Sequence, residues 1–498
     1  MRLVDSKQMQ EMDRHTIESI GVSGIVLMEN AARSWVEAAE PELRTARNTL
    51  IFCGGGNNGG DGYAIARNLA NRSIKCVAVA VKPPKSSDCI KNAEIWRHYG
   101  KTVVWEEFLS DYSPDGRDVI VDSILGTGIE STVKGDLFRI IQTINRFPGR
   151  RIAVDIPSGI SASTGDLLGT AIQSELCITF QKRKVGHFLY PGRRYSGRVV
   201  CQKISIQEVF GESDREYHLI DASMLRPILP NRPPDGYKNV FGHLLTLCGK
   251  PGTLGASLLA SYAALKTGTG LVTTALPEKE KNVFLGFAPE LMSCGREGLA
   301  AESLRSYDAL VAGCGLGRDE KVWKPLVRLI EESNLPTVLD ADAFYGISHW
   351  KRLNPQRLVL TPHPGEFSVL SGFDKPKSNR ERIRQGEEFI AKFPATLVMK
   401  GAPTIVFTSD GKICINETGN AGMATAGSGD VLAGMIGGFL AQGVAPDRAA
   451  LLATWLHGKS GDLYRDRHCE ESLTATNLIE FFDRAIRSLY DGSDSSCS

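Results

Sequence analysis

The first part of the chain contains short continuous runs of apolar residues, separated by segments whose apolar residues recur at helical spacing. Continuous apolar runs are typical of strands buried on both faces, and helices between them are the usual crossovers of a parallel sheet. The pattern therefore predicts an α/β fold with a doubly wound parallel sheet, whose functional side chains lie at the carboxyl ends of the strands. The expected strands are 49–53, 76–81, 118–122 and 151–155, and the expected helices are 15–40 with a break at 21–24, 63–70, 89–99 and 137–146. Residues 1–16 are polar and also helical in pattern.

This alternation lapses after position 205 and then begins again. Residues 211–240 are polar and rich in proline, which indicates a linker. We therefore expect one domain over 1–213 and a second over 217–490, with 214–240 forming the linker and the start of the second domain, and a disordered tail at 491–498. The expected strands of the second domain are 243–247, 270–275, 309–312, 336–339, 357–360 and 396–399, and its clearest helices are 256–267 and 430–441.

The composition argues against a nucleic-acid-binding protein and a membrane protein. A chain of 498 residues agrees with more than one domain, and its 58 Lys and Arg nearly equal its 57 Asp and Glu. No overall field therefore attracts nucleic acid, and no run of about 18 apolar residues indicates a membrane span. The 11 cysteines have no CxxC or CxxH spacing and are expected to be free thiols. A cytoplasmic protein with small-molecule partners is expected, and the sequence leaves a homo-oligomer open.

A glycine-rich segment, GGGNNGGDG at 54–62, follows the expected strand 49–53 and precedes a helix. Backbone amides at such a helix start can face an anion. Asn57, Asn58 and Asp61 interrupt the glycines and offer polar side chains beside that anion. The alternative is a glycine turn with asparagine capping, which explains the glycines but not the asparagine pair.

Two further expected strands of the first domain end in carboxylates. Asp122 precedes the segment 126–128 (GTG), and Asp155 precedes Ser158. In a parallel sheet these groups and Asn58 meet at one edge, where an isolated charge costs several kcal/mol unless it is paired or binds a cation. Oxygen ligands of this kind suit a hard cation and not zinc. Helix N-capping by Asp and Ser remains the alternative for each residue taken alone.

A second glycine segment, AGSGD at 426–430, precedes the apolar helix 430–441. Amides at this helix start also form an anion hole, and Asp430 lies in the first turn, where a base could deprotonate a hydroxyl that attacks a phosphoryl group. Simple helix capping by Asp430 is the alternative. His363 stands between two prolines at the end of an expected strand, which indicates a rigidly presented ligand contact, and the segment 400–404 (KGAPT) follows the strand 396–399.

The first domain resembles the NAD(P)H-hydrate epimerase domain through 54–62, 121–128 (VDSILGTG), 154–159 (VDIPSG), 27–31 (LMENA) and 184–186 with 191–192. The resemblance covers roughly 1–213 and implies a Rossmann-like three-layer fold. It implies that the hydrated cofactor contacts Asn57, Asn58, Gly59, Gly60, Asp61, Gly126, Thr127, Gly128, Ile129, Glu130, Ser131, Thr132 and Asp155. It also implies that Asn58, Asp122 and Ser158 bind K⁺. Arg183 departs from the family, which usually has proline there.

The second domain resembles the ribokinase-like superfamily, and within it the ADP-dependent NAD(P)H-hydrate dehydratases, through 313–317 (GCGLG), 456–462, 473–476 and the segments above. Similarity spans about 217–485. Ala426 and the segment 248–252 depart from the usual glycine and serine-rich loop. The resemblance implies that the adenine nucleotide, with Mg²⁺, contacts Lys400, Gly401, Ala402, Pro403, Thr404 and Gly429. It places the hydrate on Ala256, Gly317, His363 and Asp430.

The expected function is repair of hydrated NADH and NADPH by two steps. The C6 carbon of the hydrate is a hemiaminal, so inversion needs proton transfer there; Asp155 is the candidate acid/base, and the sequence does not separate it from Asp61. In the second step ADP would phosphorylate the C6 hydroxyl of the S hydrate, with Asp430 as base, and loss of phosphate would restore the ring and leave AMP. The alternatives are a ribokinase-like small-molecule kinase with a fused nucleotide-binding accessory domain, and a non-catalytic first domain.

Overall fold

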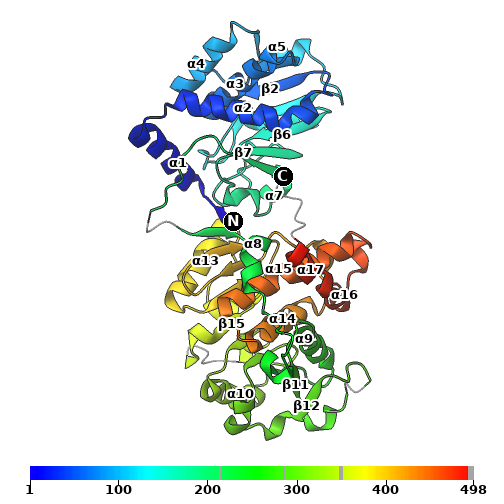
Figure 1. Cartoon of the computed structure of the whole chain (residues 1–498). Coiled ribbons are helices and arrows are strands. Elements are labelled where there is room, and N and C mark those ends of the chain that lie inside the picture. The colour runs from blue at the N-terminus through cyan, green and yellow to red at the C-terminus, as the bar shows by residue number, and fades with distance from the viewer. Residues whose placement is uncertain (212–214, 284–285, 347–351, 492–498) are drawn as a thin grey trace. The chain divides into compact units, whose positions relative to one another are not determined.

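The computed structural model describes residues 1–211, 215–283, 286–346 and 352–491, and it divides into two compact units. The N-terminal unit contains Arg2–Arg215 and Ser378–Arg380, and the C-terminal unit contains Met1, Glu216–Lys377 and Glu381–Ser498. The tail expected to be disordered lies outside the described residues except for Asp491, the last residue of a helix. Figure 1 shows strands and helices alternating along both units.

A parallel sheet forms the centre of the N-terminal unit, in the order β4-β3-β2-β5-β6-β7-β8. Thr49 pairs with Cys76 on one side and Val119 on the other, which places the central strand β2 between β3 and β5. The expected strands are confirmed to within two residues at each end. After β1 (Arg2–Leu3), the strands are β2 (Thr49–Cys53), β3 (Cys76–Ala80), β4 (Thr102–Val104), β5 (Val119–Ser123), β6 (Arg150–Val154), β7 (Leu176–Phe180) and β8 (Arg198–Gln202).

Helices cover both faces of this sheet, because successive side chains of its strands point to opposite sides. Ile51 packs in a core with Trp35 of α2, whereas Phe52 packs in a second core with Trp105 and Ile141 from α5 and α6. This gives the three layers that the resemblance implied. The helices are α1 (Ser6–Arg14), the π-helix His15–Ile20, α2 (Gly24–Leu43), α3 (Asn57–Asn71), α4 (Ser87–Trp96), α5 (Trp105–Asp111), α6 (Gly135–Arg146), the 3-10 helix Val185–His187 and α7 (Gly192–Ser196).

One helix of the N-terminal unit begins earlier than expected, whereas the expected break in another helical segment is confirmed. Helix α3 begins at Asn57 and not at 63, so the second half of the first glycine segment forms the first turns of the helix. The break expected near 21–24 is present at Gly21, which adopts a left-handed conformation with φ 88° after the π-helix. Helix α1 lies within residues 1–16, where a polar helical pattern was expected, and it buries Ser6, Gln8, Met9 and Met12.

The C-terminal unit has a mixed sheet in the order β9-β18-β17-β16-β15-β14-β13-β10-β11-β12. The strands from β12 to β16 are parallel, while β17 is antiparallel to both β16 and β18. Strand β9 lies within the segment that the sequence indicated as a linker. The strands are β9 (Tyr217–Leu219), β10 (His243–Leu247), β11 (Leu271–Leu276), β12 (Met292–Gly295), β13 (Ala309–Ala312), β14 (Thr337–Leu339), β15 (Leu358–Leu360), β16 (Thr396–Met399), β17 (Ile405–Phe407) and β18 (Ile413–Ile415).

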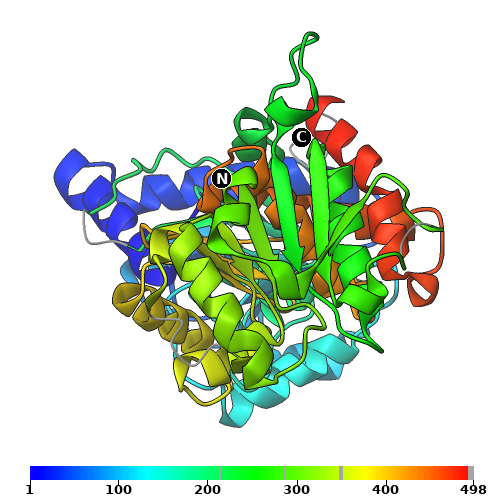
Figure 2. The same ribbon diagram turned by 90° about the horizontal axis from the view of Figure 1, so that it is seen from below.

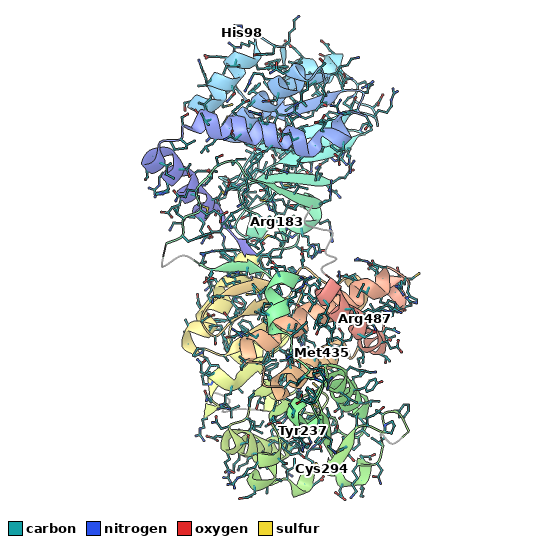
Figure 3. All side chains as sticks on the ribbon, in the orientation of Figure 1. His98, Arg183, Tyr237, Cys294, Met435 and Arg487 are labelled. Carbon is teal, nitrogen blue, oxygen red and sulfur yellow. The ribbon has the colours of Figure 1, made fainter. Side chains whose placement is uncertain are left out.

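Helices also flank both sides of this second sheet; Figure 2 shows yellow-green helices and red helices on opposite sides of the green strands. Helix α14 is buried along most of its length, and Met435 in its middle is labelled in Figure 3. The α-helices are α8 (Ala222–Leu225), α9 (Leu254–Lys266), α10 (Glu320–Ser333), α11 (Ala343–Gly346), α12 (Pro364–Ser371), α13 (Asn379–Lys392), α14 (Ser428–Ala441), α15 (Pro446–Arg465), α16 (Ala475–Glu480) and α17 (Phe482–Asp491). Short 3-10 helices are Arg226–Ile228, Lys238–Phe241, Glu278–Glu280, Arg296–Gly298, Ala301–Ser306, Pro355–Arg357, Ala421–Met423 and Glu470–Ser472.

In the described part of the chain, none of the helices combines the length and the apolar character that crossing a bilayer requires. The cysteines of the described residues are free, and Cys469 is exposed while most of the others are buried.

Candidate functional site

A cavity of about 890 Å³ opens in the N-terminal unit, where the strands β2, β5 and β6 end. This is the edge at which a parallel sheet presents its functional loops. Most of the residues proposed from sequence for the first site line the cavity: Asn57, Asn58, Asp61, Gly126, Thr127, Gly128, Ile129, Glu130, Ser131, Thr132 and Asp155. The structure therefore brings together three segments that lie far apart in the sequence.

Gly59 and Gly60 were expected at the same site, but neither is among the residues that line the cavity. A Cβ atom on Gly59 would lie 1.9 Å from the carbonyl oxygen of Gly54, and one on Gly60 would lie 2.7 Å from Sδ of Met28. Side chains at these positions would therefore push α3 away from the strand loop and from α2. The structure gives both glycines a packing role that holds Asn57, Asn58 and Asp61 at the cavity.

The three residues proposed to bind a cation meet beneath the cavity. Asp122 accepts hydrogen bonds from the amide of Ser158 at 2.7 Å and from its hydroxyl at 2.5 Å. Burial raises the pKa of Asp122 to about 6, although these hydrogen bonds oppose the shift. The side-chain oxygen and nitrogen of Asn58 are buried and have no hydrogen-bond partner among the described residues. Buried amides without partners are rare in proteins, so Asn58 fits a site that is completed by a ligand.

Asp155 occupies a strained position at the end of β6. Its φ is 67°, in the left-handed region that non-glycine residues rarely adopt and that is concentrated at functional sites. Its Oδ1 atom accepts hydrogen bonds from the hydroxyl of Thr179 at 2.8 Å, from the amide of Phe180 at 3.2 Å and from the ammonium of Lys184. The carboxylate is thus held by three donors while its side chain stays 14% exposed.

Lys184 decides the protonation state of this site. Its side chain is fully buried, and its ammonium also donates to the hydroxyl of Thr179 at 2.8 Å and the carbonyl of Phe180 at 3.0 Å. Burial alone would raise the pKa of Asp155, but the charge and hydrogen bond of Lys184 outweigh it and lower that pKa below the ordinary value. Asp155 is therefore an ionised base at neutral pH. Arg183, the residue that departs from the family, directly precedes Lys184 and is labelled in Figure 3.

The cavity contains two more carboxyl groups with shifted pKa values. Burial raises the pKa of Asp61 well above its ordinary value, with added repulsion from Asp155 and Asp13. Asp13, from α1, also lines the cavity. The sequence pattern gave Lys184 and Asp13 no role. A basic residue after a buried strand was the available signal for Lys184, whereas Asp13 lies in a polar helix where no local pattern singles out one carboxylate.

In the C-terminal unit, the second glycine segment starts helix α14 as expected. Gly427 has φ 85° and is the N-cap, and a Cβ atom there would lie 2.4 Å from Leu259. Asp430 is half-buried in the first turn. Burial and then the charge of Asp340 raise its pKa to about 6, against smaller opposing effects of Cys314 and Lys400. The helix start thus places a carboxyl group that titrates near neutral pH beside its free amides.

Lys400 and Asp340 form a buried ion pair next to this helix start. The ammonium lies 2.7 Å from Oδ1 of Asp340 and 3.7 Å from Glu366. Oδ1 of Asp340 also accepts from the hydroxyl of Thr361 at 2.7 Å. A Cβ atom on Gly429 would lie 3.3 Å from the Lys400 ammonium, so Gly429 and Lys400 are brought together as the sequence implied. Asp340 was recognised only as the end of a strand.

A group of possible ligand atoms lies between these residues. Sγ of Cys314, a carboxylate oxygen of Asp340 and one of Asp430 are within 4.8 Å of one another. Oδ1 of Asp340 accepts from Lys400 and Thr361, whereas Oδ2 accepts only a weak hydrogen bond from the thiol of Cys314 at 3.6 Å and is the oxygen better placed to bind a ligand. Two carboxylates suit a hard cation such as Mg²⁺, whereas the thiol of Cys314 does not.

His363 serves as the N-cap of α12, which the sequence did not indicate. Its Nδ1 atom accepts hydrogen bonds from the amides of Gly365 at 3.0 Å and Glu366 at 3.2 Å. Nε2 lies 3.2 Å from a carboxylate oxygen of Glu366. The side chain is 54% exposed, so the imidazole caps the helix and still presents one face to solvent near the site.

The remaining residues proposed for the second site fall in two neighbouring loops. Ala256 of α9 contacts the 315–317 loop, because a Cβ atom on Gly315 would lie 2.9 Å from its methyl group. The amide of Gly317 donates to Asp342 at 2.8 Å. Gly401 packs on Arg382, whose guanidinium donates to the carbonyl of Met399 at 2.7 Å and whose pKa burial lowers to about 10. The other residues of the Lys400 loop, Ala402, Pro403 and Thr404, connect β16 to β17.

Family models match both halves of the chain. A model described as NAD(P)H-hydrate dehydratase matches residues 244–484, and one described as YjeF-related protein N-terminus matches residues 24–186. The Bifunctional NAD(P)H-hydrate repair enzyme Nnr of Moorella thermoacetica is 35% identical over 98% of this chain and 97% of its own length. The protein of the same name from Thermofilum pendens is 31% identical over 99% and 98%.

A solved structure resembles the C-terminal half of the chain. The ADP/ATP-dependent NAD(P)H-hydrate dehydratase from Bacillus subtilis, co-crystallised with ATP and Mg²⁺, has 29% identity and a TM-score of 0.50, and the match covers 55% of this chain and 98% of that one. A ribokinase-like superfamily protein from Enterococcus faecalis also matches, with 26% identity and a TM-score of 0.50 over 57% of this chain and 99% of that one. The fold is thus ribokinase-like in this half, as the sequence predicted. Because relatives of the same name match at 35% and 31% identity over nearly the whole chain, the chain belongs to the family of bifunctional NAD(P)H-hydrate repair enzymes.

Proposed function

We propose that the N-terminal unit interconverts the R and S hydrates of NADH and NADPH at C6, and that the C-terminal unit dehydrates the S hydrate at the expense of ADP. The products of the second step are NAD(P)H, AMP and phosphate. The observation that carries this proposal is the presence, in one chain, of an acidic cavity with an ionised Asp155 and of a separate helix start where Asp430 adjoins the Lys400–Asp340 pair.

In the first step the hydrate occupies the cavity of the N-terminal unit. Its phosphates and sugar contact the two loops 57–61 and 126–132, where backbone amides and short polar side chains are available. Asp155 accepts or returns a proton at the C6 hydroxyl, because Lys184 keeps its carboxylate ionised. Asp61, whose pKa is raised, remains protonated and donates a hydrogen bond to the ligand.

Asn58, Asp122 and Ser158 fit a potassium ion beside this cavity. The unpartnered amide oxygen of Asn58 and the buried carboxylate of Asp122 are hard oxygen donors, and the oxygen of a neutral amide carries no charge that would favour a smaller divalent ion. When bound, the ion supplies positive charge to a loop that faces phosphate. Asp122, whose burial opposes ionisation, would be stabilised as a carboxylate.

This cation assignment has a test that does not depend on catalysis. A ligand that binds only the folded state raises the melting temperature as its concentration rises. We expect thermal unfolding of the N-terminal unit to shift upward in KCl relative to NaCl of equal ionic strength. The matched variant Asn58→Ala should abolish this difference, whereas equal shifts in both proteins would contradict the assignment.

In the second step the adenine nucleotide contacts the Lys400–Thr404 loop and Gly429, and the hydrate contacts Ala256, Gly317, His363 and Asp430. Asp430 takes the proton of the C6 hydroxyl as it attacks the terminal phosphoryl group, and the amides of 427–429 stabilise the charge on the transferring oxygens. Mg²⁺ bound with the nucleotide would neutralise phosphate charge, and the carboxylate of Asp340 is the group that would hold it while Asp430 acts as the base. Loss of phosphate from C6 and of a proton from C5 to solvent then forms the C5=C6 double bond and restores the nicotinamide ring.

The decisive experiment supplies the purified R and S hydrates separately, each with ADP, with ATP or with no nucleotide. The return of reduced-nicotinamide absorbance is followed. We expect recovery from both hydrates with a nucleotide and none without it. Recovery from S alone would contradict epimerisation by the N-terminal unit, and a stable phosphorylated product would instead favour a small-molecule kinase.

A further inference from the structure

Helix α1 brings an additional carboxyl group, Asp13, to the cavity of the N-terminal unit. Met9 and Gln10 of the same helix also line the cavity. The helix is fixed at its start by a capping box between Asp5 and Gln8, with hydrogen bonds of 2.9 Å and 3.1 Å. Asp13 is therefore carried by an ordered helix and not by a loose end of the chain.

This helix also contacts the loop expected to hold the hydrate. The hydroxyl of Ser6 donates to the carbonyl of Thr127 at 2.5 Å, and the amide of Ser6 donates to the hydroxyl of Ser163 at 3.1 Å. Met9 and Met12 are buried in the core. A helix fixed to the 126–132 loop and to the core holds Asp13 in place when ligand enters.

Three carboxyl groups line the cavity, and the ammonium of one buried lysine is bonded to one of them. Asp13, Asp61 and Asp155 all line it, and Lys184 is bonded to Asp155. Further charged residues line the wider cavity: Lys82, Asp88, Glu130 and Lys134. Like charges in one partly buried site disfavour ionisation of all its members, so the group paired with Lys184 ionises and the others tend to keep a proton.

We infer that Asp13 is the proton donor that works together with Asp155 in the epimerisation, an inference that rests on the function proposed for this unit. Environments that separate two carboxyl groups in this way define an acid and a base. Burial raises the pKa of Asp13 to about 6, with Lys184 opposing and Asp155 adding to the shift. Asp155, by contrast, has its pKa lowered through Lys184.

With Asp13 as acid and Asp155 as base, every proton in the reaction is accounted for. Asp13 gives its proton to the C6 hydroxyl; the C6–O bond breaks with its electrons on oxygen, water leaves, and the nitrogen lone pair forms a C6=N1 double bond. Water then adds to the opposite face of C6, the C=N electrons return to nitrogen, and Asp155 accepts the proton that the added water loses. The reverse reaction uses Asp155 as acid and Asp13 as base.

Asp61 is less suited to this exchange. Burial, and then the charges of Asp155 and Asp13, raise its pKa well above the ordinary value, which favours the protonated form. A group that both gives and regains a proton works best when its pKa lies near the operating pH. Asp61 therefore orients the ligand, whereas Asp13 moves the proton.

The test compares Asp13→Asn with the native full-length chain, by measuring kcat and KM for conversion of R to S hydrate across a pH series. The Asn variant should lose about 10²- to 10⁴-fold in kcat, the range typical of a general acid, with little change in KM. The native rate should fall as pH rises above about 6, because Asp13 then loses its proton. The residual rate of the variant should lack this fall, and Asp13→Glu should retain it at reduced kcat.

Glu11→Gln is the matched control. Glu11 lies in the same helix, is 46% exposed and pairs with Arg14 at 3.1 Å, so its loss should leave kcat, KM and the pH profile unchanged. A native kcat in Asp13→Asn would overturn the inference, as would a slower variant that keeps the native fall above pH 6. Disappearance of that fall in Asp61→Asn instead would assign the donor to Asp61. A native chain that does not interconvert the hydrates would overturn the proposed function itself, before any variant is compared.

Discussion

The sites of the two units both contain a buried lysine and several aspartates, but the lysine is paired with a different kind of aspartate in each. Each has a buried lysine and more than one carboxyl group at the end of a parallel strand, but Lys184 is bonded to the proposed catalytic Asp155, whereas Lys400 is bonded to Asp340 and not to Asp430. Against the effect of its burial, Lys184 lowers the pKa of Asp155, whereas burial, and then the charge of Asp340, raise the pKa of Asp430 to about 6 because Lys400 is bonded elsewhere. The comparison shows that the pKa of each proposed catalytic aspartate depends on whether the buried lysine is bonded to it, and not on how many charged groups the site contains.

The variant Asp430→Asn should have the largest effect and should abolish one of the two reactions selectively. Removing the base should lower kcat for dehydration of the S hydrate by about 10²- to 10⁴-fold, because general base catalysis contributes on this scale. Interconversion of the hydrates, measured by chromatography of the two epimers, should keep its native rate. Native dehydration in this variant would remove Asp430 from the mechanism.

Lys184→Met breaks the pairing in the N-terminal unit. Loss of the ammonium leaves the Asp155 carboxylate buried without its counter-ion, which costs about 3 kcal/mol of folding free energy for a pair of this kind and raises the pKa of Asp155. We expect slower epimerisation at neutral pH and a lower unfolding midpoint in urea. Lys182→Met is a suitable control, since Lys182 pairs with Glu208 at 2.7 Å away from Asp155. Equal effects of the two variants would contradict the role of Lys184.

The rates of the two reactions measured over a pH series test whether Asp155 and Asp430 differ in pKa. Asp430 must be ionised to act as a base, so dehydration should fall about tenfold per unit as pH drops below about 6. Epimerisation should not fall over the same range, because Asp155 has a lowered pKa and stays ionised there. Parallel acid losses in the two assays, each corrected for the uncatalysed rate, would show that the lysine pairing does not distinguish the sites.

The smallest expected effects come from two threonines that make equivalent bonds. Thr179 donates to Asp155 at 2.8 Å and Thr361 donates to Asp340 at 2.7 Å. Replacement by valine should cost about 1 kcal/mol of stability in each case. Thr179→Val should also slow epimerisation alone, and Thr361→Val should slow dehydration alone, as measured with the separated hydrates. If either variant slowed the reaction of the other unit as well, the assignment of one threonine to each site would be contradicted.

Much of the fold could be predicted because local sequence determines it. His243–Leu247, Ala309–Ala312 and Thr396–Met399 are apolar runs between turns, and each is a strand with the expected limits. The antiparallel strands β17 and β18 were missed because each has only three residues and no periodicity. The helical pattern of residues 1–16 was predicted, and α1 forms within it at Ser6–Arg14, although a mostly polar helix also depends on contacts with distant segments for its stability.

The candidate sites could be predicted only where a residue follows a strand or a glycine segment. Asp155 follows β6 and Asp430 lies in the first turn of α14, and the structure places each at a site with a shifted pKa. The pairing of Lys184 with Asp155 joins residues 29 positions apart, and that of Lys400 with Asp340 joins residues 60 apart. No local pattern encodes such a choice of partner, so the protonation states had to come from the three-dimensional structure.

The first glycine segment has a consequence for how the sequence can vary. A Cβ atom on Gly54 would lie 1.9 Å from the carbonyl oxygen of Ile124, and Gly59 has an equally close contact to Gly54, so neither position can accept even alanine without moving backbone. Gly56, two residues from Gly54, has open space around its Cβ position and an ordinary φ of −93°. In a saturation mutagenesis library selected for folding alone, survivors should therefore retain Gly54 and Gly59 while many residues replace Gly56, and serine or aspartate should be enriched at position 56 because they cap helices. Selection for epimerisation should restrict Gly56 as well, because it lines the cavity.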